Sequence, residues 1–434
     1  MILFSDFLSA ETLYTLKLTL VYSSLALLLS WAGALACVKL KSRRLFSLFE
    51  IFWVLPGFAY ALITLFTLKM LHVQIRYSMN SVLIAWVIAG VPYLSLSFRQ
   101  AWLDLDLRER DALVTLGAGP AQVWYYFDFL RTLPTQLSSL LQQYWLYLTS
   151  FSLVMILSGG PPNETLEVGI YTSVRLNQVN FTHACALGLW QMLILILLRF
   201  FLRKQGVPIS DRREKQSHRV AFKKQFFLLL AGVTLAIFFA KWKGLDLDGF
   251  WLGLGTSLLL AATVSGFTLI FSLALYYSGL RWCAELGAWI SPMLLTLFVW
   301  KIFGFTLPPL LCCFLLQSLL FAPWVARSFF PLLDRSRTFE LEAARTLGAS
   351  PFRAWREIEW NRVKISAQWM AGFIFSLSLT EVTTVLLFSR NDFEPLSVWV
   401  QNYFLRFRLD EAIFGTGVLV MISYFAVSRE ERAA

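Results

Sequence analysis

The sequence is poor in the residues that build catalytic and metal sites. Its 434 residues include three histidines, five cysteines and no Gly-Lys dipeptide. The missing dipeptide excludes the phosphate-binding loop that ends in Gly-Lys-Ser/Thr, and the cysteines have no Cys-x-x-Cys spacing that would indicate a zinc site. No Ser/His/Asp set or pair of carboxylates emerges in the apolar segments either. We therefore expect no catalytic residue, no metal site and no cofactor in this chain.

Charged residues are also scarce, at 15%, whereas hydrophobic residues make up 57%. Soluble domains are about 45–50% apolar, so this composition predicts an all-α polytopic membrane protein. The net charge of +11 would suit a nucleic-acid-binding protein. Lys and Arg also gather in the cytoplasmic loops of membrane proteins, and this explanation fits the rest of the composition better. We expect membrane lipid, and no nucleic acid, as a partner.

Apolar runs long enough to cross a bilayer, roughly 20 residues each, predict about 11 transmembrane helices. Five lie before a basic stretch, at 13–38, 46–68, 81–98, 137–157 and 181–202. Six follow it, at 226–240, 250–277, 286–303, 307–329, 367–388 and 412–427. The predicted domains are a first half, 1–203, a cytoplasmic linker, 204–224, and a second half, 225–434. The count of five and six leaves open whether a first span is missing.

One polar segment occurs twice. Residues 109–124 recur as residues 340–355, 231 positions later, with eight of sixteen residues identical. A match this dense at one spacing indicates internal duplication. If both copies are cytoplasmic, the basic segment 39–44, the linker and the tail 429–432 are also inside, in agreement with the positive-inside rule. This predicts two parallel repeats, with the N-terminus outside and the C-terminus in the cytoplasm.

Each copy has the pattern of two short helices joined by a tight break. Positions 341, 344 and 347 share one helix face, and Gly348 is suited to a left-handed helix end. Ser350-Pro351 then restarts a helix, with Ser as the N-cap and Pro in the first turn. In the first copy Gly119 replaces this capping serine.

These segments resemble the EAA loop of binding-protein-dependent ABC importer permeases, in which Glu-Ala-Ala precedes a glycine, an isoleucine and Leu-Pro at fixed spacings. In the second copy Glu342-Ala343-Ala344, Gly348 and Ile358 fit. In the first copy Asp111-Ala112-Leu113 and Gly117 fit partly, and Phe127 takes the isoleucine place. Both copies lack the closing Leu-Pro.

The resemblance implies a type I ABC importer permease fold with coupling loops at 99–136 and 330–366. The candidate coupling residues are Glu109, Asp111, Ala112, Leu116 and Gly117, and then Glu340, Glu342, Ala343, Ala344, Leu347 and Gly348. It further implies two copies of a separate ATPase subunit that binds ATP and Mg, a periplasmic solute-binding protein, and a bacterial inner membrane. The alternative is an amphipathic cytoplasmic helix without a partner.

Two outer loops suggest a branch of this family. Residues 157–171 and 387–393 resemble the corresponding loops of thiamine importer permeases, and ferric-iron permeases are close relatives. The implied solute is thiamine or a related small compound. The alternatives are a ferric-iron or other small-solute permease, or a secondary transporter, which would need ion-coupling residues in its spans.

The candidate residues of a translocation path are few. Glu381 stands in the apolar run 376–388, where a charge is expensive and normally faces a cavity or a partner. Its counterpart at the offset of 231 is Ser150, and Pro92 and Pro323 match at the same offset. A proline inside a span kinks the helix and frees a carbonyl. The alternatives are a structural, protonated or paired glutamate, and ordinary membrane-helix prolines.

Overall fold

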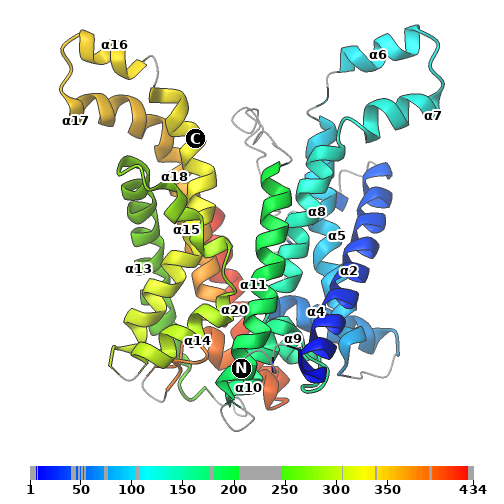
Figure 1. Ribbon diagram of the computed structural model, residues 1–434, viewed down its shortest axis with the longest axis vertical. Coiled ribbons are helices and arrows are strands. Elements are labelled where there is room, and N and C mark those ends of the chain that lie inside the picture. Colours follow the sequence, from blue (N-terminus) through cyan, green and yellow to red (C-terminus); the bar gives the residue numbers. More distant parts are fainter. Residues whose placement is uncertain are drawn as a thin grey trace. The chain divides into compact units, whose positions relative to one another are not determined.

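The computed structural model describes most of the chain, which divides into two compact units, Met1–Leu228 and Leu229–Ala434. The residues described are 6, 8–40, 45, 46, 49, 52, 55–72, 77–103, 105, 107–175, 180–204, 247–304, 306–337, 340–390 and 393–428. Within them every regular element is a helix (Figure 1). The predicted span 226–240 and nearly all of the predicted linker lie outside the described residues.

The first unit contains two long helices, α2 and α5, that pack on each other, and shorter helices around them. Its elements are α2 (Ala10–Lys39), α4 (Gly57–Met70), α5 (Met79–Leu103), α6 (Leu107–Thr115), α7 (Pro120–Val123), the π-helix η1 (Trp124–Phe129), α8 (Leu133–Leu148), α9 (Ser152–Leu157), α10 (Leu166–Arg175) and α11 (Phe181–Lys204).

The second unit is built in the same way around α13, which packs on α15 and α18. Its elements are α13 (Phe250–Tyr277), the 3-10 helix η3 (Arg281–Ala288), α14 (Pro292–Phe303), α15 (Pro309–Arg337), α16 (Glu340–Thr346), α17 (Pro351–Ala354), the π-helix η4 (Trp355–Glu359), α18 (Trp360–Thr380), α19 (Leu396–Leu405) and α20 (Leu409–Ser428).

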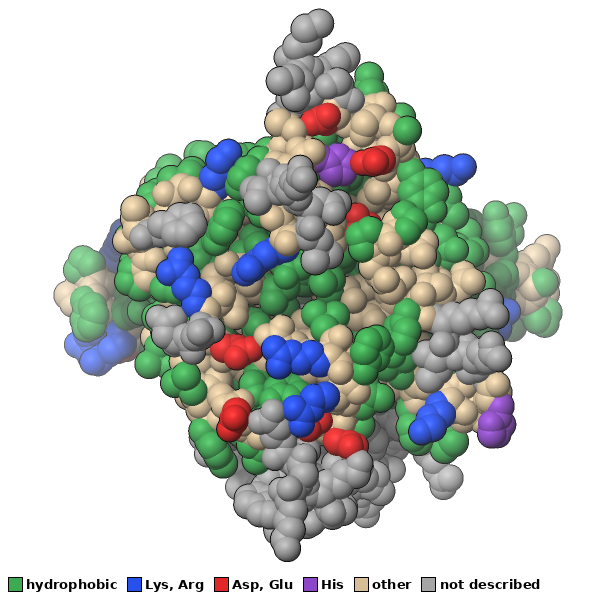
Figure 2. All heavy atoms as spheres, turned by 90° about the horizontal axis from the view of Figure 1, so that it is seen from below, with side chains coloured by type: hydrophobic (Ala, Val, Ile, Leu, Met, Phe, Trp, Pro, Cys, Tyr) green, Lys and Arg blue, Asp and Glu red, His purple; other side chains and the backbone are tan. Residues whose placement is uncertain are grey.

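The long helices α2 and α13 bury many small and hydroxylated residues, although α13 also buries several large ones, among them Phe250, Leu260 and Tyr276. In α2 the buried face consists of Thr12, Thr15, Thr19, Ser23, Ala26, Ser30, Ala34 and Val38. In α13 it includes Gly253, Ser257, Ala261, Ser265, Thr268 and Ser272. Small residues let membrane helices approach closely, while large apolar side chains suit lipid tails. The end of the molecule drawn in Figure 2 carries Lys, Arg, Asp and Glu side chains scattered among apolar ones.

The all-α polytopic class is confirmed. Six of the described helices are long and apolar enough to cross a membrane, or seven if η3 and α14, which meet at 101°, form one bent span. These six are α2, α5, α11, α13, α15 and α20. The count of 11 spans stays a prediction.

Three predicted spans differ from the helices observed among the described residues, and a fourth is described only in part. The span 46–68 contains α4, which begins after Pro56, and part of the span before Pro56 lies outside the described residues. The span 286–303 is bent at Ser291, the N-cap of α14. The span 137–157 is broken between α8 and α9, and 367–388 ends as a helix at Thr380. Hydropathy records only that a run is apolar, so it does not detect these helix ends.

Several elements recur at the offset of 231. The short helix α7 corresponds to α17 residue for residue, and the π-helices η1 and η4 both begin at the matching tryptophans, Trp124 and Trp355. The break after α8, at Ser150, corresponds to the end of α18, at Glu381. Near the far end of each unit, α10 and α19 start within one residue of matching positions.

Candidate functional site

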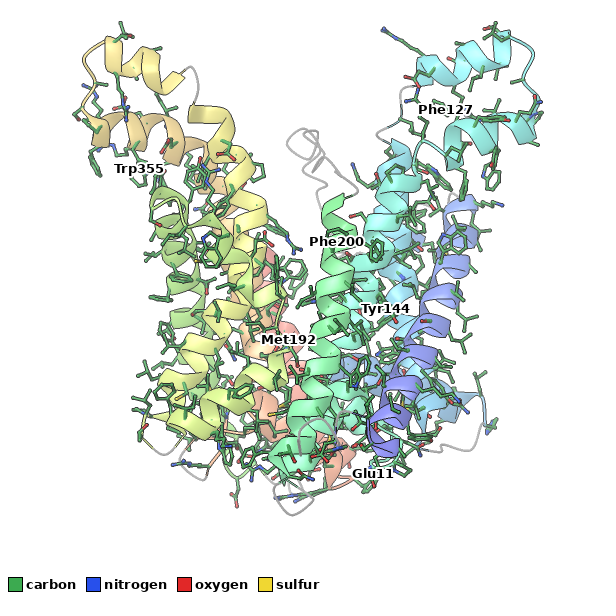
Figure 3. All side chains as sticks on the ribbon, in the orientation of Figure 1. Glu11, Phe127, Tyr144, Met192, Phe200 and Trp355 are labelled. Carbon is green, nitrogen blue, oxygen red and sulfur yellow. The ribbon has the colours of Figure 1, made fainter. Side chains whose placement is uncertain are left out.

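The two predicted coupling loops occupy one end of each unit. In the first unit α6 and α7 lie at the end opposite α9 and α10, and in the second unit α16 and α17 lie at the end opposite α14 (Figure 1). A π-helix follows each pair, and such segments often mark functional places in helices. Phe127, which takes the family's isoleucine position, is buried in η1 (Figure 3).

The predicted left-handed helix ends are confirmed in both loops. Gly117 has φ +87° and Gly348 has φ +84°. The N–H of Ala118 donates to the carbonyl of Leu113, 3.0 Å, and the N–H of Ala349 donates to that of Ala344, also 3.0 Å. With the shorter-range bonds from the two glycine N–H groups, these form the same Schellman end in both copies. The chain direction is thus reversed in the same way in each loop.

The start of the second helix differs between the loops as the sequence predicts. Ser350 Oγ accepts the N–H of Arg353 at 3.3 Å and caps α17. Gly119 has no side chain to do this, and instead its N–H donates to Gln122 Oε1 at 3.0 Å. Only half of the reciprocal capping arrangement is therefore present in the first loop.

Each loop presents a leucine at its turn. The side chain of Leu116 is 83% exposed and that of Leu347 is 87% exposed. The two residues occupy matching positions directly before the left-handed glycines, so the Schellman end holds each leucine outward. Ala112 and Ala343 are also exposed, Ala344 is half-buried, and the side chains of Glu340 and Glu342 lie outside the described residues. Exposed apolar residues held on a rigid turn are suited to a pocket in a partner.

Two further contacts connect segments of the first loop with each other and with α5. Arg131 Nη2 lies 2.9 Å from Glu109 Oε2, and both side chains are more than half exposed. Trp102, at the end of α5, donates its indole N–H to the carbonyl of Asp128 at 2.8 Å. The ion pair joins α6 to the residues that follow η1, and the indole bond joins α5 to η1. Asp111 is exposed.

The sequence placed Glu381 inside a predicted span, whereas the structure places it at the end of helix α18. It is the C-cap of α18, with extended backbone (φ −71°, ψ 127°), and its side chain is half-buried. Its Oε1 accepts the N–H of Thr383 at 2.8 Å, and its carbonyl accepts the hydroxyl of Ser397 at 2.8 Å. The carboxylate thus stabilises the turn that follows α18.

The hydroxyls of two neighbouring threonines, Thr380 and Thr384, bond to groups other than Glu381. The hydroxyl of Thr384 accepts a hydrogen bond from Gln317 Nε2 at 3.1 Å, and that of Thr380 donates to the carbonyl of Ser376 at 3.1 Å. Gln317 also accepts the hydroxyl of Ser378 through its Oε1. These bonds tie the turn to α15 and satisfy buried polar groups.

Ser150 stands at the matching break of the first unit. Its Oγ accepts the indole N–H of Trp86 at 2.9 Å and donates to the carbonyl of Tyr147 at 2.9 Å. Both halves therefore interrupt a helix at this position with a hydrogen-bonded polar residue. Pro92 lies inside α5 and Pro323 inside α15, both buried. Their positions within the helices agree with the sequence prediction.

Three carboxylates beside α10 and α19 were not predicted from the sequence as candidate site residues. Glu164 accepts the hydroxyl of Thr172 at 2.8 Å, and Glu167, fully buried, accepts a hydrogen bond from Gln191. Burial raises the pKa of the Glu164 carboxyl, although the Thr172 bond opposes this. In the second unit Glu394 accepts from Asn402 at 2.6 Å, at a matching place. The signal was present in the sequence as acidic residues just before or at the start of α10 and α19.

Replacing Gly348 by leucine should loosen the second loop. A side chain at positive φ costs about 1–2 kcal/mol, and an added Cβ would meet no atom within 4 Å, so the cost comes from the backbone alone. We expect amide hydrogen exchange over residues 344–349 to be about tenfold faster. Gly348→Asn is the control, because asparagine tolerates the left-handed region. Equal exchange in the two variants would show that the positive φ is not what holds the loop.

Comparison with characterised proteins identifies distant relatives. The chain is 21% identical over 394 residues to "Thiamine transport system permease protein ThiP" of Haemophilus influenzae, covering 80% of this chain and 71% of that protein. It is 23% identical over 350 residues to the protein of the same name in Brucella melitensis, covering 72% and 64%. It is 21% identical over 130 residues to "Probable sulfate transport system permease protein cysT" of Helicosporidium sp., covering 30% and 48%.

No protein-family model and no solved structure matches the chain. The matched regions span between 48% and 71% of the lengths of these relatives. The two relatives that match most of the chain are permeases of the branch suggested by its outer loops. The resemblance stated from the sequence is thereby confirmed at the level of the family.

Proposed function

We propose that this chain, which resembles the thiamine-type ABC importer permeases at the level of the family, is the membrane-spanning permease subunit of an ATP-driven importer. One observation carries the proposal more than any other. Two loops of the same construction, at an offset of 231 residues, each hold an exposed leucine on a Schellman turn at one end of a helical unit. Apolar side chains held outward on rigid turns, at matching places in both loops, are what docking into a partner's pocket requires.

The partner we propose for each loop is an ABC ATPase subunit. Leu116 and Leu347 would enter apolar pockets of two ATPase copies, and the small residues Ala112, Ala343 and Ala344 would let the loop helices approach closely. ATP and Mg would be bound by the ATPase and not by this chain. Closure of the ATPase pair would then move the two loops, and through them the two halves. This chain would supply the path and the transmission of movement.

The solute we propose is thiamine or a related small compound. Two of the relatives named above are thiamine permeases, and they match most of the chain. The relative named as a sulfate permease matches only 30% of it, so another small solute is the second candidate. A periplasmic binding protein would deliver the solute to the outer ends of the two units. The residues that would line the translocation path, or let its helices bend, are Glu381, Ser150, Pro92 and Pro323.

We further propose a location in a bacterial inner membrane, with the N-terminus outside and the C-terminus in the cytoplasm. The basic segments next to the coupling loops support this orientation through the positive-inside rule. The domain boundaries proposed from the sequence, 1–203 and 225–434 with a linker between them, agree with an architecture of two membrane halves joined on the cytoplasmic side.

Stoichiometry tests the proposal. The chain is co-expressed with the ABC ATPase of the same organism and purified through a tag on the chain, and the mass of the complex is measured by light scattering. We expect two ATPase subunits for each chain, because the chain carries two loops. One ATPase per chain would show that one loop does not bind, and none would contradict the proposal.

A further inference from the structure

Two adjacent tyrosines at the end of α13 contact both the end of α15, the segment that enters the second coupling loop, and η4, the segment that leaves it. We call these two segments the legs of the loop. Trp355, the first residue of η4, donates its indole N–H to Tyr277 Oη at 2.8 Å. Tyr277 Oη in turn donates to Glu359 Oε2 at 2.5 Å, and Glu359 is only 3% exposed. Trp355 lies where η4 approaches the end of α13 (Figure 3). The first and last residues of η4 are thus both hydrogen-bonded to the hydroxyl of Tyr277.

Tyr276 contacts the leg that enters the loop. Its Oη donates to Asp334 Oδ1 at 2.9 Å, and Asp334 is near the end of α15. Arg281 Nη1 pairs with the same carboxylate at 2.9 Å, and its guanidinium lies 4.2 Å from the centre of the Tyr276 ring. Hydrogen bonds to charged groups are stronger than those between neutral groups. Together the two tyrosines join α15 and η4 to the end of one helix.

The opposite end of α13 is joined to α19. The N–H of Leu396, the first residue of α19, donates to Ser257 Oγ at 2.8 Å. Trp399 donates its indole N–H to the carbonyl of Asp248 at 2.9 Å, and its ring lies 5.5 Å from that of Phe250. Hydrogen bonds at both ends of a single 28-residue helix connect the coupling loop to an outer helix.

The first unit has the same outer contact and a different one at the loop. The N–H of Leu166, the first residue of α10, donates to Thr19 Oγ1 of α2 at 3.0 Å. At the loop, Lys39 Nζ lies 5.0 Å from the centre of the Trp124 ring. An exposed cation–π contact is weaker and less directional than hydrogen bonds to a carboxylate. The first loop is therefore held less firmly to α2 than the second loop is to α13.

We propose that Tyr276 and Tyr277 are positioning residues that bind both legs of the second coupling loop to α13, so that α13 carries the displacement of the loop to α19. The effect on transport rests on the proposed function, whereas the bonding of the loop to α13 does not. The two halves then transmit movement through different contacts, hydrogen bonds to α13 in the second half and a cation–π contact with α2 in the first.

The bonding is tested on the full chain in lipid nanodiscs, without any partner. In Tyr277→Phe we expect amide hydrogen exchange over residues 355–363 to be about tenfold faster, because two hydrogen bonds to the hydroxyl are lost. In Tyr276→Phe the increase should fall at the end of α15 instead. Tyr125→Phe, which removes an exposed hydroxyl in the first loop, is the control and should leave residues 355–363 unchanged. Unchanged exchange in both tyrosine variants would overturn the proposal.

The transmission is tested on the complex with its ATPase and binding protein, using radiolabelled thiamine as the probe. In Tyr277→Phe we expect the ATP hydrolysed for each thiamine taken up to rise severalfold, while ATPase co-purification stays normal. Lys39→Met, at the matching contact of the first unit, should raise this ratio less. Faster amide hydrogen exchange in Tyr277→Phe, with an unchanged amount of ATP hydrolysed for each thiamine taken up, would overturn the role of α13 in transmission. If the wild-type chain binds no ATPase, the proposed function fails, and the exchange result still decides whether the tyrosines hold the loop.

Discussion

Replacing Leu116 and Leu347 together by aspartate should abolish the binding of the ATPase subunit to this chain. Burial of a leucine side chain contributes about 1.5–3 kcal/mol, and a charge placed in an apolar pocket adds a desolvation cost. We therefore expect at least a hundredfold weaker binding at each loop. The measurement is the co-purification of the ATPase with the tagged chain, followed by titration of the purified ATPase onto the chain in nanodiscs.

Each single variant should retain one ATPase subunit, which separates the two loops. The matched control replaces both leucines by methionine, which keeps an apolar side chain of similar size and should leave binding within a few fold of the wild type. Both leucines are largely exposed in the chain itself, so the aspartates should not disturb folding. Normal binding in the double aspartate variant would mean that the loops dock through another surface, or not at all.

Replacing Glu381 by glutamine should nearly abolish the uptake of a cationic solute. Two unit charges 4 Å apart interact with about 4 kcal/mol at an effective dielectric constant of 20, so losing the carboxylate charge should lower thiamine uptake at least a hundredfold. The amide keeps an oxygen that can accept the N–H of Thr383, so the turn after α18 should survive. The measurement is the initial rate of thiamine uptake, with ATP hydrolysis by the complex recorded beside it.

Glu381→Ala separates the charge from the turn. Alanine removes the acceptor as well, so it should destabilise the segment after Thr380 and lower both uptake and the yield of folded chain. If the glutamine variant transports normally and only the alanine variant is impaired, Glu381 is a structural cap and the electrostatic role is wrong. The structure places the residue at a helix end with a backbone partner, so both variants are needed to tell the two roles apart.

The sequence predicted best those features that depend on local chemistry. The helix ends at Gly117 and Gly348 and the cap at Ser350 follow from the conformational freedom of glycine and from side-chain capping, and both are properties of a few adjacent residues. The bounds of α13 were also predicted correctly, since a polar or glycine residue flanks its apolar run at either end.

The helix breaks at Ser150 and Glu381 could not be read from the sequence, because they lie inside apolar runs. What interrupts these helices is hydrogen bonding with other elements, such as the bond from Trp86 to Ser150 and that from Ser397 to Glu381. The contacts of Tyr277 likewise join residues about 80 positions apart. Such pairings depend on tertiary packing, for which periodicity and hydropathy carry no signal.

The central claim, that this chain conducts a solute under the control of a separate ATPase, is tested most directly by uptake into proteoliposomes. The chain is reconstituted with its ATPase and binding protein, and the uptake of the radiolabelled solute that this binding protein retains is measured. We predict accumulation only when ATP, the ATPase and the binding protein are all present, and none when any of the three is omitted. Uptake by the chain alone, driven by a proton or sodium gradient and indifferent to ATP, would contradict the account and identify a secondary transporter.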